Sequence, residues 1–171
     1  MSKLALVVGG ASCVWDDLAA VGRTPDLVVC VNDSGTVYPN AFAAWVSLHP
    51  VKFPIWERAR RAKGLPGGYL KWSQPSDHNA RRVDRTLGGW KHGSSSFLAV
   101  GVAFEMGATE VVLCGVPMQA EGAHFFSPDK PWDQVDRYTA AWVEAAHKLR
   151  GRVYSMSGWT RELLGAPPWV G

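Results

Sequence analysis

A glycine and three serines of this chain are placed where they could bind an anion. Gly93-Ser94-Ser95-Ser96 directly precedes an apolar run that continues to Met106. A serine hydroxyl in such a place can cap the free N–H groups at the start of a helix. The same N–H groups, with the positive end of the helix dipole, can hold a phosphate or a carboxylate. Capping alone needs one serine, so we expect the cluster to do both.

Two further polar clusters follow apolar runs in the N-terminal part of the chain. Gly9 and Gly10 follow the run "LALVV". A glycine turn in this place can lie close under a phosphate, or it can be a tight turn that binds no ligand. Asn32 and Asp33 follow "LVVCV", where Asn32 can hydrogen-bond a base or ribose edge, or only form an Asx-turn. Neither the dinucleotide fingerprint nor a P-loop is present in full.

His124, in the loop "EGAHFF", is the candidate general base, because an imidazole titrates near neutral pH. A lone loop histidine is often incidental, and that interpretation stays open. The spacing yields no Ser-His-Asp arrangement and no cluster of metal ligands, so we assign no metal site. Asp16, Asp17 and Asp33 could nevertheless hold Mg²⁺ together with substrate phosphates.

Apolar runs that predict strands alternate with stretches that predict helices. The strands and their turns are expected at residues 4–10, 25–33, 43–50, 110–116 and 152–156. The helices are expected at residues 12–20, 54–64, 95–106, 131–151 and 159–165, with Ser12 capping the first. Because the strands are apolar throughout, we predict one α/β domain, residues 1–171, whose mostly parallel sheet has helices on both faces.

The carboxyl ends of the predicted strands are followed by small or polar residues. These are Gly9-Gly10-Ala11-Ser12, Asn32-Asp33-Ser34, His49-Pro50, Pro117-Met118 and Ser155 to Gly158. Ligands of parallel sheets bind beyond these strand ends. The agreement between separate strands therefore predicts a nucleotide crevice.

The net charge of +3 is unevenly distributed along the chain. From Lys52 to Lys91 there are ten Lys and Arg against three Asp and Glu, a net of +7, whereas the remainder holds eight against twelve, a net of −4. We expect residues 52–92 to be a basic, irregular insertion or lid that attracts nucleotide, phosphorylated substrate or nucleic acid. The alternative is a solvated loop balanced by the acidic remainder.

Three cysteines and the N-terminus indicate the compartment. Cys13, Cys30 and Cys114 are far apart and flanked by apolar residues, as expected of reduced thiols in a cytoplasmic protein. The first ten residues hold one lysine and an apolar run too short for a signal peptide or a membrane span. A homodimer is possible, since nine tryptophans are many for this length and exposed ones would favour association.

Several segments together resemble one family. They are "VVGGASCVWDDL", "VVCVNDS" and "GSSSFLAVGVAFEMGATEVVLCGVPM", followed by "GVPMQAEGAHFF" and "VYSMSGWTRELLGAPP". This order is similar to that of the small bacterial sialyltransferases with a Rossmann-like fold and of the related hydroxymethylpterin pyrophosphokinase-like proteins. The resemblance is closer to bacteriophage-encoded members of this group, which would place the protein in the host cytoplasm.

The resemblance implies a nucleotide or nucleotide-sugar ligand and a set of contacts for it. With the strand-end pattern, it assigns nucleotide binding to Gly9, Gly10, Ser12, Asn32, Asp33, Gly93, Ser94, Ser95, Ser96, Met118, Ser155, Ser157 and Gly158. The chain departs from the family where Pro117 replaces an Asp and where Gln119 and Phe125 replace tyrosines that help the phosphate to leave.

Three hypotheses about function follow. The first is a glycosyltransferase-like enzyme in which Arg81, Arg82 and Arg85 neutralise the leaving phosphate and His124 takes the acceptor proton. The second is a non-catalytic nucleotide-binding protein, a sensor or sponge, which would explain the missing Asp and Tyr. The third is a nucleic-acid-binding module in which Trp56, Trp72 and Trp90 of the basic segment stack on bases.

Overall fold

The structure, a computed structural model, describes residues 2–90, 94–120, 124–127, 131–132 and 134–170. The strands are β1 (Leu4–Val8), β2 (Leu27–Val31), β3 (Ala44–Val46), β4 (Leu70–Ser73), β5 (Arg85–Thr86), β6 (Glu110–Cys114) and β7 (Val153–Ser155). The helices are α1 (Val14–Ala20), α2 (Phe53–Ala62), α3 (Asp77–Ala80), α4 (Ser95–Glu105), α5 (Val135–Leu149) and α6 (Gly158–Leu164), with 3₁₀ turns η1 (Asn32–Thr36) and η2 (Pro50–Lys52).

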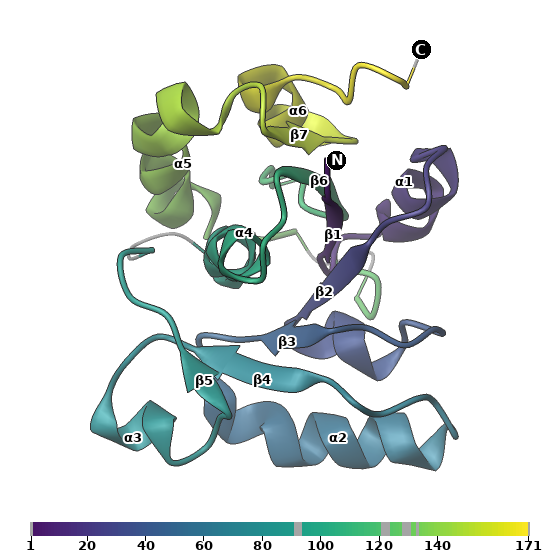
Figure 1. The fold of residues 1–171 in the computed structure, drawn as a ribbon, viewed down its shortest axis with the longest axis vertical. Helices are drawn as coiled ribbons and strands as arrows, with labels where there is room; N and C mark the ends of the chain where they lie inside the picture. Colours follow the sequence, from purple (N-terminus) through teal and green to yellow (C-terminus); the bar gives the residue numbers. More distant parts are fainter. Residues whose placement is uncertain (1, 91–93, 121–123, 128–130, 133, 171) are drawn as a thin grey trace.

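The strands form one seven-stranded sheet in the order β5-β4-β3-β2-β1-β6-β7, and every pairing is parallel. The order reverses at β1, which pairs with β2 on one side and with β6 on the other (Figure 1). A parallel sheet with this reversal is Rossmann-like, as the alternation of runs predicted. The chain is a single α/β domain.

Helices cover both faces of the sheet, and alternate side chains of β1 show why. Ala5 and Val7 pack with α4, α5 and α6, whereas Leu4, Leu6 and Val8 pack with α1 and α2. A strand buried on both faces must be apolar at every position, which is why "LALVV" lacks the alternation of a half-exposed strand. No helix in the described part of the chain has the length and apolar character needed to cross a bilayer.

The segment from Lys52 to Trp90 is more regular than expected. It contributes α2, β4, α3 and β5, so it extends the sheet by two strands. These strands escape sequence analysis because they are short and near the sheet edge: β4 starts exposed, and both residues of β5 are exposed. Whether the segment closes over the site as a lid stays a prediction.

Other predicted boundaries shift. The expected cap of α1 is wrong, because Cys13 occupies the N-cap position and Ser12 is exposed. β3 ends at Val46 instead of continuing to Pro50, and α5 begins at Val135 instead of Pro131.

The cysteines are free, as expected, and burial raises the pKa of the Cys30 and Cys114 thiols.

A buried arginine connects α2 to the chain that follows β2. Arg60 is 1% exposed, and its guanidinium donates hydrogen bonds to the carbonyl oxygens of Gly35, Tyr38, Asn40 and Pro66 at 2.7 to 2.9 Å. Burial lowers its pKa, yet an arginine stays charged at neutral pH. Carbonyl dipoles therefore satisfy this cation and hold the connection from η1 to β3.

We expect Arg60→Met to lower the free energy of unfolding by roughly 2–4 kcal/mol, because several carbonyl oxygens lose a buried donor at once. Arg58→Met, at an exposed position of the same helix, is the matched control and should change stability little. Urea unfolding followed by circular dichroism measures both. Equal stability of the two variants would contradict this role of Arg60.

Candidate functional site

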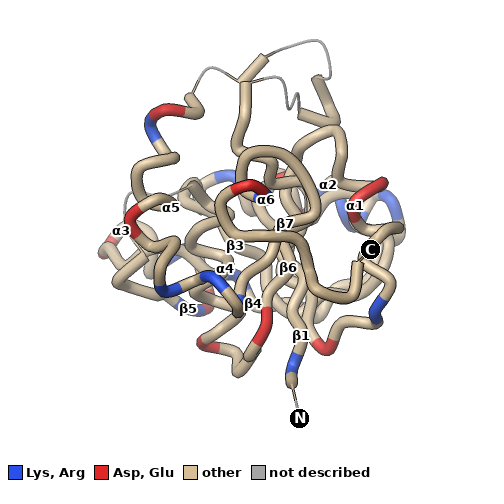
Figure 2. The backbone as a smooth tube through the Cα atoms, turned by 90° about the horizontal axis from the view of Figure 1, so that it is seen from above, with Lys and Arg blue, Asp and Glu red and all other residues tan. Residues whose placement is uncertain are grey.

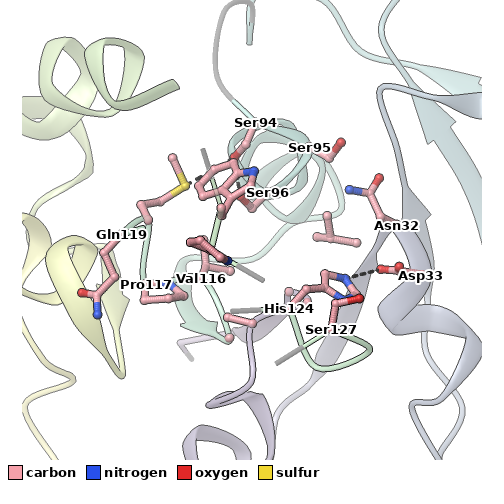
Figure 3. A pocket seen from close by; sticks show the side chains of 18 residues that line it. Asn32, Asp33, Ser94, Ser95, Ser96, Val116, Pro117, Gln119, His124 and Ser127 are labelled. Atoms are coloured by element: carbon pink, nitrogen blue, oxygen red, sulfur yellow. Dashed lines mark hydrogen bonds and ion pairs between the residues drawn. The ribbon is translucent and has the colours of Figure 1, made fainter. Parts of the chain in front are cut away.

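A pocket of about 400 Å³ opens at the carboxyl ends of β1, β2 and β6, where the strand order reverses. The sequence-predicted residues that line it are Gly9, Gly10, Asn32, Asp33, Ser94, Ser95, Ser96, Met118 and His124. Figure 3 shows Asn32 and Asp33 on one side of this pocket, Pro117 and Gln119 on the other, and the three serines between them. The structure thus brings together four segments that are far apart in the sequence.

The backbone at the floor of the pocket is packed so closely that it requires glycine. A Cβ on Gly9 would lie 2.3 Å from the carbonyl oxygen of Gly115 and 2.6 Å from Val116 Cγ2. A Cβ on Gly10 would lie 2.6 Å from His124 Nε2. Gly9 therefore lets the chains leaving β1 and β6 touch, and Gly10 leaves room for the imidazole.

The start of α4 presents its backbone N–H groups to the pocket. Ser94 is at the N-cap position, but its hydroxyl bonds to that of Ser96 and caps no N–H group, so the predicted cap is wrong. The Ser95 hydroxyl accepts the Leu48 N–H at 3.1 Å. The N–H groups of Ser95 and Ser96 have no acceptor within the described residues. These two donors and the helix dipole can bind an anion.

Two residues of the pocket have a strained backbone. Asn32 (φ 52°) and Met118 (φ 51°) are the non-glycine residues with positive φ in the described ranges, and both line the pocket. Trp45 Nε1 donates to the Asn32 carbonyl, and Ser47 Oγ donates to Asn32 Oδ1 at 2.8 Å. Such strain persists where surrounding contacts enforce it, and it gathers at functional sites.

His124 and Asp33 form a pair across the pocket mouth. His124 Nε2 lies 3.0 Å from Asp33 Oδ1 (Figure 3). His124 Nδ1 accepts the Phe126 N–H at 3.2 Å. Because Nδ1 is an acceptor, the neutral ring carries its proton on Nε2 and donates it to Asp33. His124 is thus oriented by a carboxylate, and Nδ1 is its basic nitrogen.

Four predicted nucleotide contacts lie outside the pocket lining. Ser12 is exposed, whereas Ser155 is buried and bonds Thr160 Oγ1 at 2.8 Å. Ser157 donates to Asp17 Oδ2 at 2.8 Å, and a Cβ on Gly158 would meet Pro117 Cβ at 2.3 Å. In this structure Ser155, Ser157 and Gly158 brace the wall of the pocket from behind.

The three arginines predicted to neutralise the leaving phosphate also lie outside the pocket lining. Arg81 and Arg82 line a separate exposed hollow beside α3, and the guanidinium of Arg85, in β5, lies 5.9 Å from the centre of the Trp72 ring. β5 is four strands from β1, roughly 19 Å at about 4.8 Å per strand. Figure 2 shows Lys and Arg spread over many elements and not gathered at one end of the sheet. Gly93 lies outside the described residues.

Several residues that shape the pocket were not predicted. Gly115, Val116, Ser127 and Trp132 line it, together with Gln119, which the resemblance had placed at the position of a family tyrosine. Asp17 is buried and accepts the Gly115 N–H at 2.7 Å, which positions the turn after β6. Among these segments, "GVPM" could have been recognised from the sequence, because it directly follows an apolar run. The contribution of Asp17 could not, because it depends on the packing of α1 against β6.

The three acidic residues considered for Mg²⁺ do not converge. Asp17 bonds Gly115 and Ser157, Asp33 faces His124, and Asp16 is exposed. Within the described ranges, no group of three or more His, Cys, Asp or Glu could hold a metal ion.

Comparison with known proteins adds information about the fold. No protein-family model matches the chain, and a search of curated proteins finds no significant sequence match.

Two solved structures are similar in three dimensions. The sialyltransferase CST-II in complex with a trisaccharide acceptor and CMP aligns over 97% of this chain and 86% of its own, with a TM-score of 0.63 and 10% identity. CstII from Campylobacter jejuni with the substrate analogue CMP-3FNeuAc aligns over 98% and 87%, with a TM-score of 0.60 and 12% identity. The chain therefore has a sialyltransferase-like fold.

We expect Gly9→Ala to lower the free energy of unfolding by roughly 1–3 kcal/mol, because the added methyl group must push apart the chains leaving β1 and β6. Gly67→Ala is the control, since a Cβ there meets nothing within 4 Å. Thermal or urea unfolding of both variants measures the difference. A Gly9→Ala protein as stable as Gly67→Ala would show that the two chains are not in close contact.

Proposed function

We propose that this protein binds a nucleotide-sugar in the pocket and transfers the sugar to an acceptor. The observation that carries the proposal is the pocket itself: helix N–H groups that have no acceptor among the described residues, two strained residues and an oriented imidazole at the reversal of a sialyltransferase-like sheet. The solved structures of this fold contain CMP or a CMP-sugar analogue, which supports a nucleotide as the ligand.

The phosphate would lie at the start of α4. No Lys or Arg lines the pocket within the described residues, so the N–H groups of Ser95 and Ser96 and a dipole of about half a positive charge would carry its recognition. Fixed backbone donors need no reorganisation when charge develops on a leaving group. Arg81, Arg82 and Arg85 would contribute only if their segment moved toward the pocket.

The remaining chemistry would take place at His124. An acceptor hydroxyl would replace the Phe126 N–H at Nδ1, and its oxygen would attack the anomeric carbon of the sugar. The bond from that carbon to the phosphate oxygen would break, and the nucleoside monophosphate would leave with the electron pair. The hydroxyl proton would pass to Nδ1, and Asp33 would stabilise the imidazolium through Nε2.

A specific observation favours a second candidate, a nucleotide-binding protein without turnover. The described pocket lining contains no Arg, Lys or Tyr, the side chains that would stabilise a leaving phosphate beyond the helix N–H groups. Binding without any release of nucleoside monophosphate from a bound nucleotide-sugar would select this candidate.

Binding of nucleic acid has less support. Trp72 is 5% exposed, and Trp56 stacks on Trp45 at 6.1 Å between ring centroids. Trp90 packs against Phe97 at 5.0 Å. These rings are engaged in the domain, so the proposed stacking surface is not presented in this structure.

We expect Ser95→Pro to weaken CMP binding about tenfold or more, since it removes one charge-assisted hydrogen bond worth about 1.5–3 kcal/mol. Proline fits the first position of a helix, and Ser94 already has the extended backbone (ψ 173°) that a following proline requires. Ser95→Ala is the matched control because both variants lose the hydroxyl that accepts from Leu48.

Calorimetric titration with CMP and with cytidine tests this. The proline variant should lose the preference for CMP, whereas the alanine variant should keep it. Equal CMP affinity of the two variants would remove α4 as the phosphate site. If CMP, other nucleotides and nucleotide-sugars all fail to bind the wild type at millimolar concentration, the proposed function is wrong.

We expect His124→Gln to reduce transfer from a CMP-sugar roughly a hundredfold or more, the usual contribution of a general base. The affinity for CMP should change much less, because the phosphate contacts lie on α4. The exposed His49 lies outside the pocket lining, so His49→Gln is the control. Unchanged turnover in His124→Gln would exclude His124 as the base.

A further inference from the structure

A cluster of aromatic side chains lies beside His124. The rings of Phe125 and Phe126 stack on the imidazole, with centroids 4.6 and 5.7 Å away, and Phe125 and Phe126 are 4.2 Å apart. Trp15 of α1 packs edge-on against Phe125 at 6.3 Å. Trp15, Phe125 and Phe126 are called the aromatic platform below.

The platform is unusually open to solvent. Trp15 is 42% exposed and Phe126 is 53% exposed. The other large apolar side chains that are exposed in the described part of the chain are all aliphatic. Exposed aromatic side chains that gather beside a pocket, while Trp45 and Trp142 are fully buried, indicate a binding surface.

The backbone attaches the platform to the catalytic end of the site. The Phe125 N–H donates to the Gly10 carbonyl at 2.9 Å, and the Phe126 N–H donates to His124 Nδ1. A molecule on the exposed face of Phe126 would thus lie next to the nitrogen that accepts a proton in the proposed transfer. Ser127, which lines the pocket, provides a hydroxyl at the same place.

The chemistry of this surface fits a sugar. A sugar ring has an apolar C–H face that can lie on an aromatic ring, and a rim of hydroxyls that can bond to Ser127 and Asp33. Trp15 and Phe126 do not belong to the pocket lining, so a nucleotide inside the pocket does not need them. The occupant should therefore be the second substrate.

We propose that the aromatic platform binds the acceptor sugar and presents one of its hydroxyls to His124 Nδ1, where the hydroxyl replaces the Phe126 N–H. This inference rests on the proposed function, since it places the acceptor of the same transfer.

Saturation-transfer-difference NMR with lactose as the probe, in the presence of saturating CMP, tests the inference. Phe126→Leu should weaken lactose binding about three- to tenfold, as expected when one aromatic contact is lost. Phe126→Tyr keeps the ring and should retain binding. Ile55→Ala, at an exposed apolar position on α2, is the matched control and should behave as the wild type.

The CMP affinity of each variant, measured by calorimetry, separates the possible failures. If CMP does not bind the wild type, the proposed function fails before the platform is tested. If CMP binds but lactose gives no saturation transfer, or gives the same in Phe126→Leu as in the wild type, this inference is wrong. A Phe126→Leu variant that loses CMP affinity instead would assign the platform to the nucleotide, which also overturns it.

Discussion

The parallel pairing of β1 with both β2 and β6 is the constraint on which the rest of the structure depends. It points the carboxyl ends of three buried strands in one direction and opens a crevice where the strand order reverses. Because the chains leaving β1 and β6 touch at Gly9 and Gly115, the floor of that crevice is backbone. Side chains that could do chemistry are thereby confined to its rim.

Polar groups buried around this crevice give its loops their shape. The guanidinium of Arg60 gathers carbonyl groups of the connection after η1, and the carboxylate of Asp17 holds the turn after β6. Both are single buried charges satisfied by backbone or hydroxyl groups and not by an opposite charge. Such interactions fix loop geometry in a way that apolar packing, which is non-directional, does not.

In the proposed transfer, binding and proton transfer take place at separate ends of the site. The anion-binding end, at the start of α4, consists of backbone N–H groups on a helix buried against the sheet. The proposed proton acceptor, His124, lies on a loop that is connected to the β1 turn by the hydrogen bond from the Phe125 N–H to the Gly10 carbonyl and to η1 by the contact of His124 with Asp33. A buried helix end for the phosphate and a more exposed loop for the acceptor would suit the proposed transfer between two substrates.

The sequence by itself determined the fold class and the position of the crevice, because strands buried on both faces must be continuously apolar and must end in residues that a ligand can approach. It predicted Gly9 and Asn32 for that reason, the serines of α4 from their place before an apolar helical run, and His124 from the chemistry of an imidazole in the loop that follows β6. The tertiary structure alone decided which of the polar strand ends meet: Ser155 and Ser157 brace the wall, whereas Gln119 and Ser127 line the pocket. It also decided that β5, with Arg85, lies at the far edge of the sheet. These outcomes depend on strand order and on long-range contacts of single side chains such as Asp17 and Arg60, and no local pattern of residues encodes them.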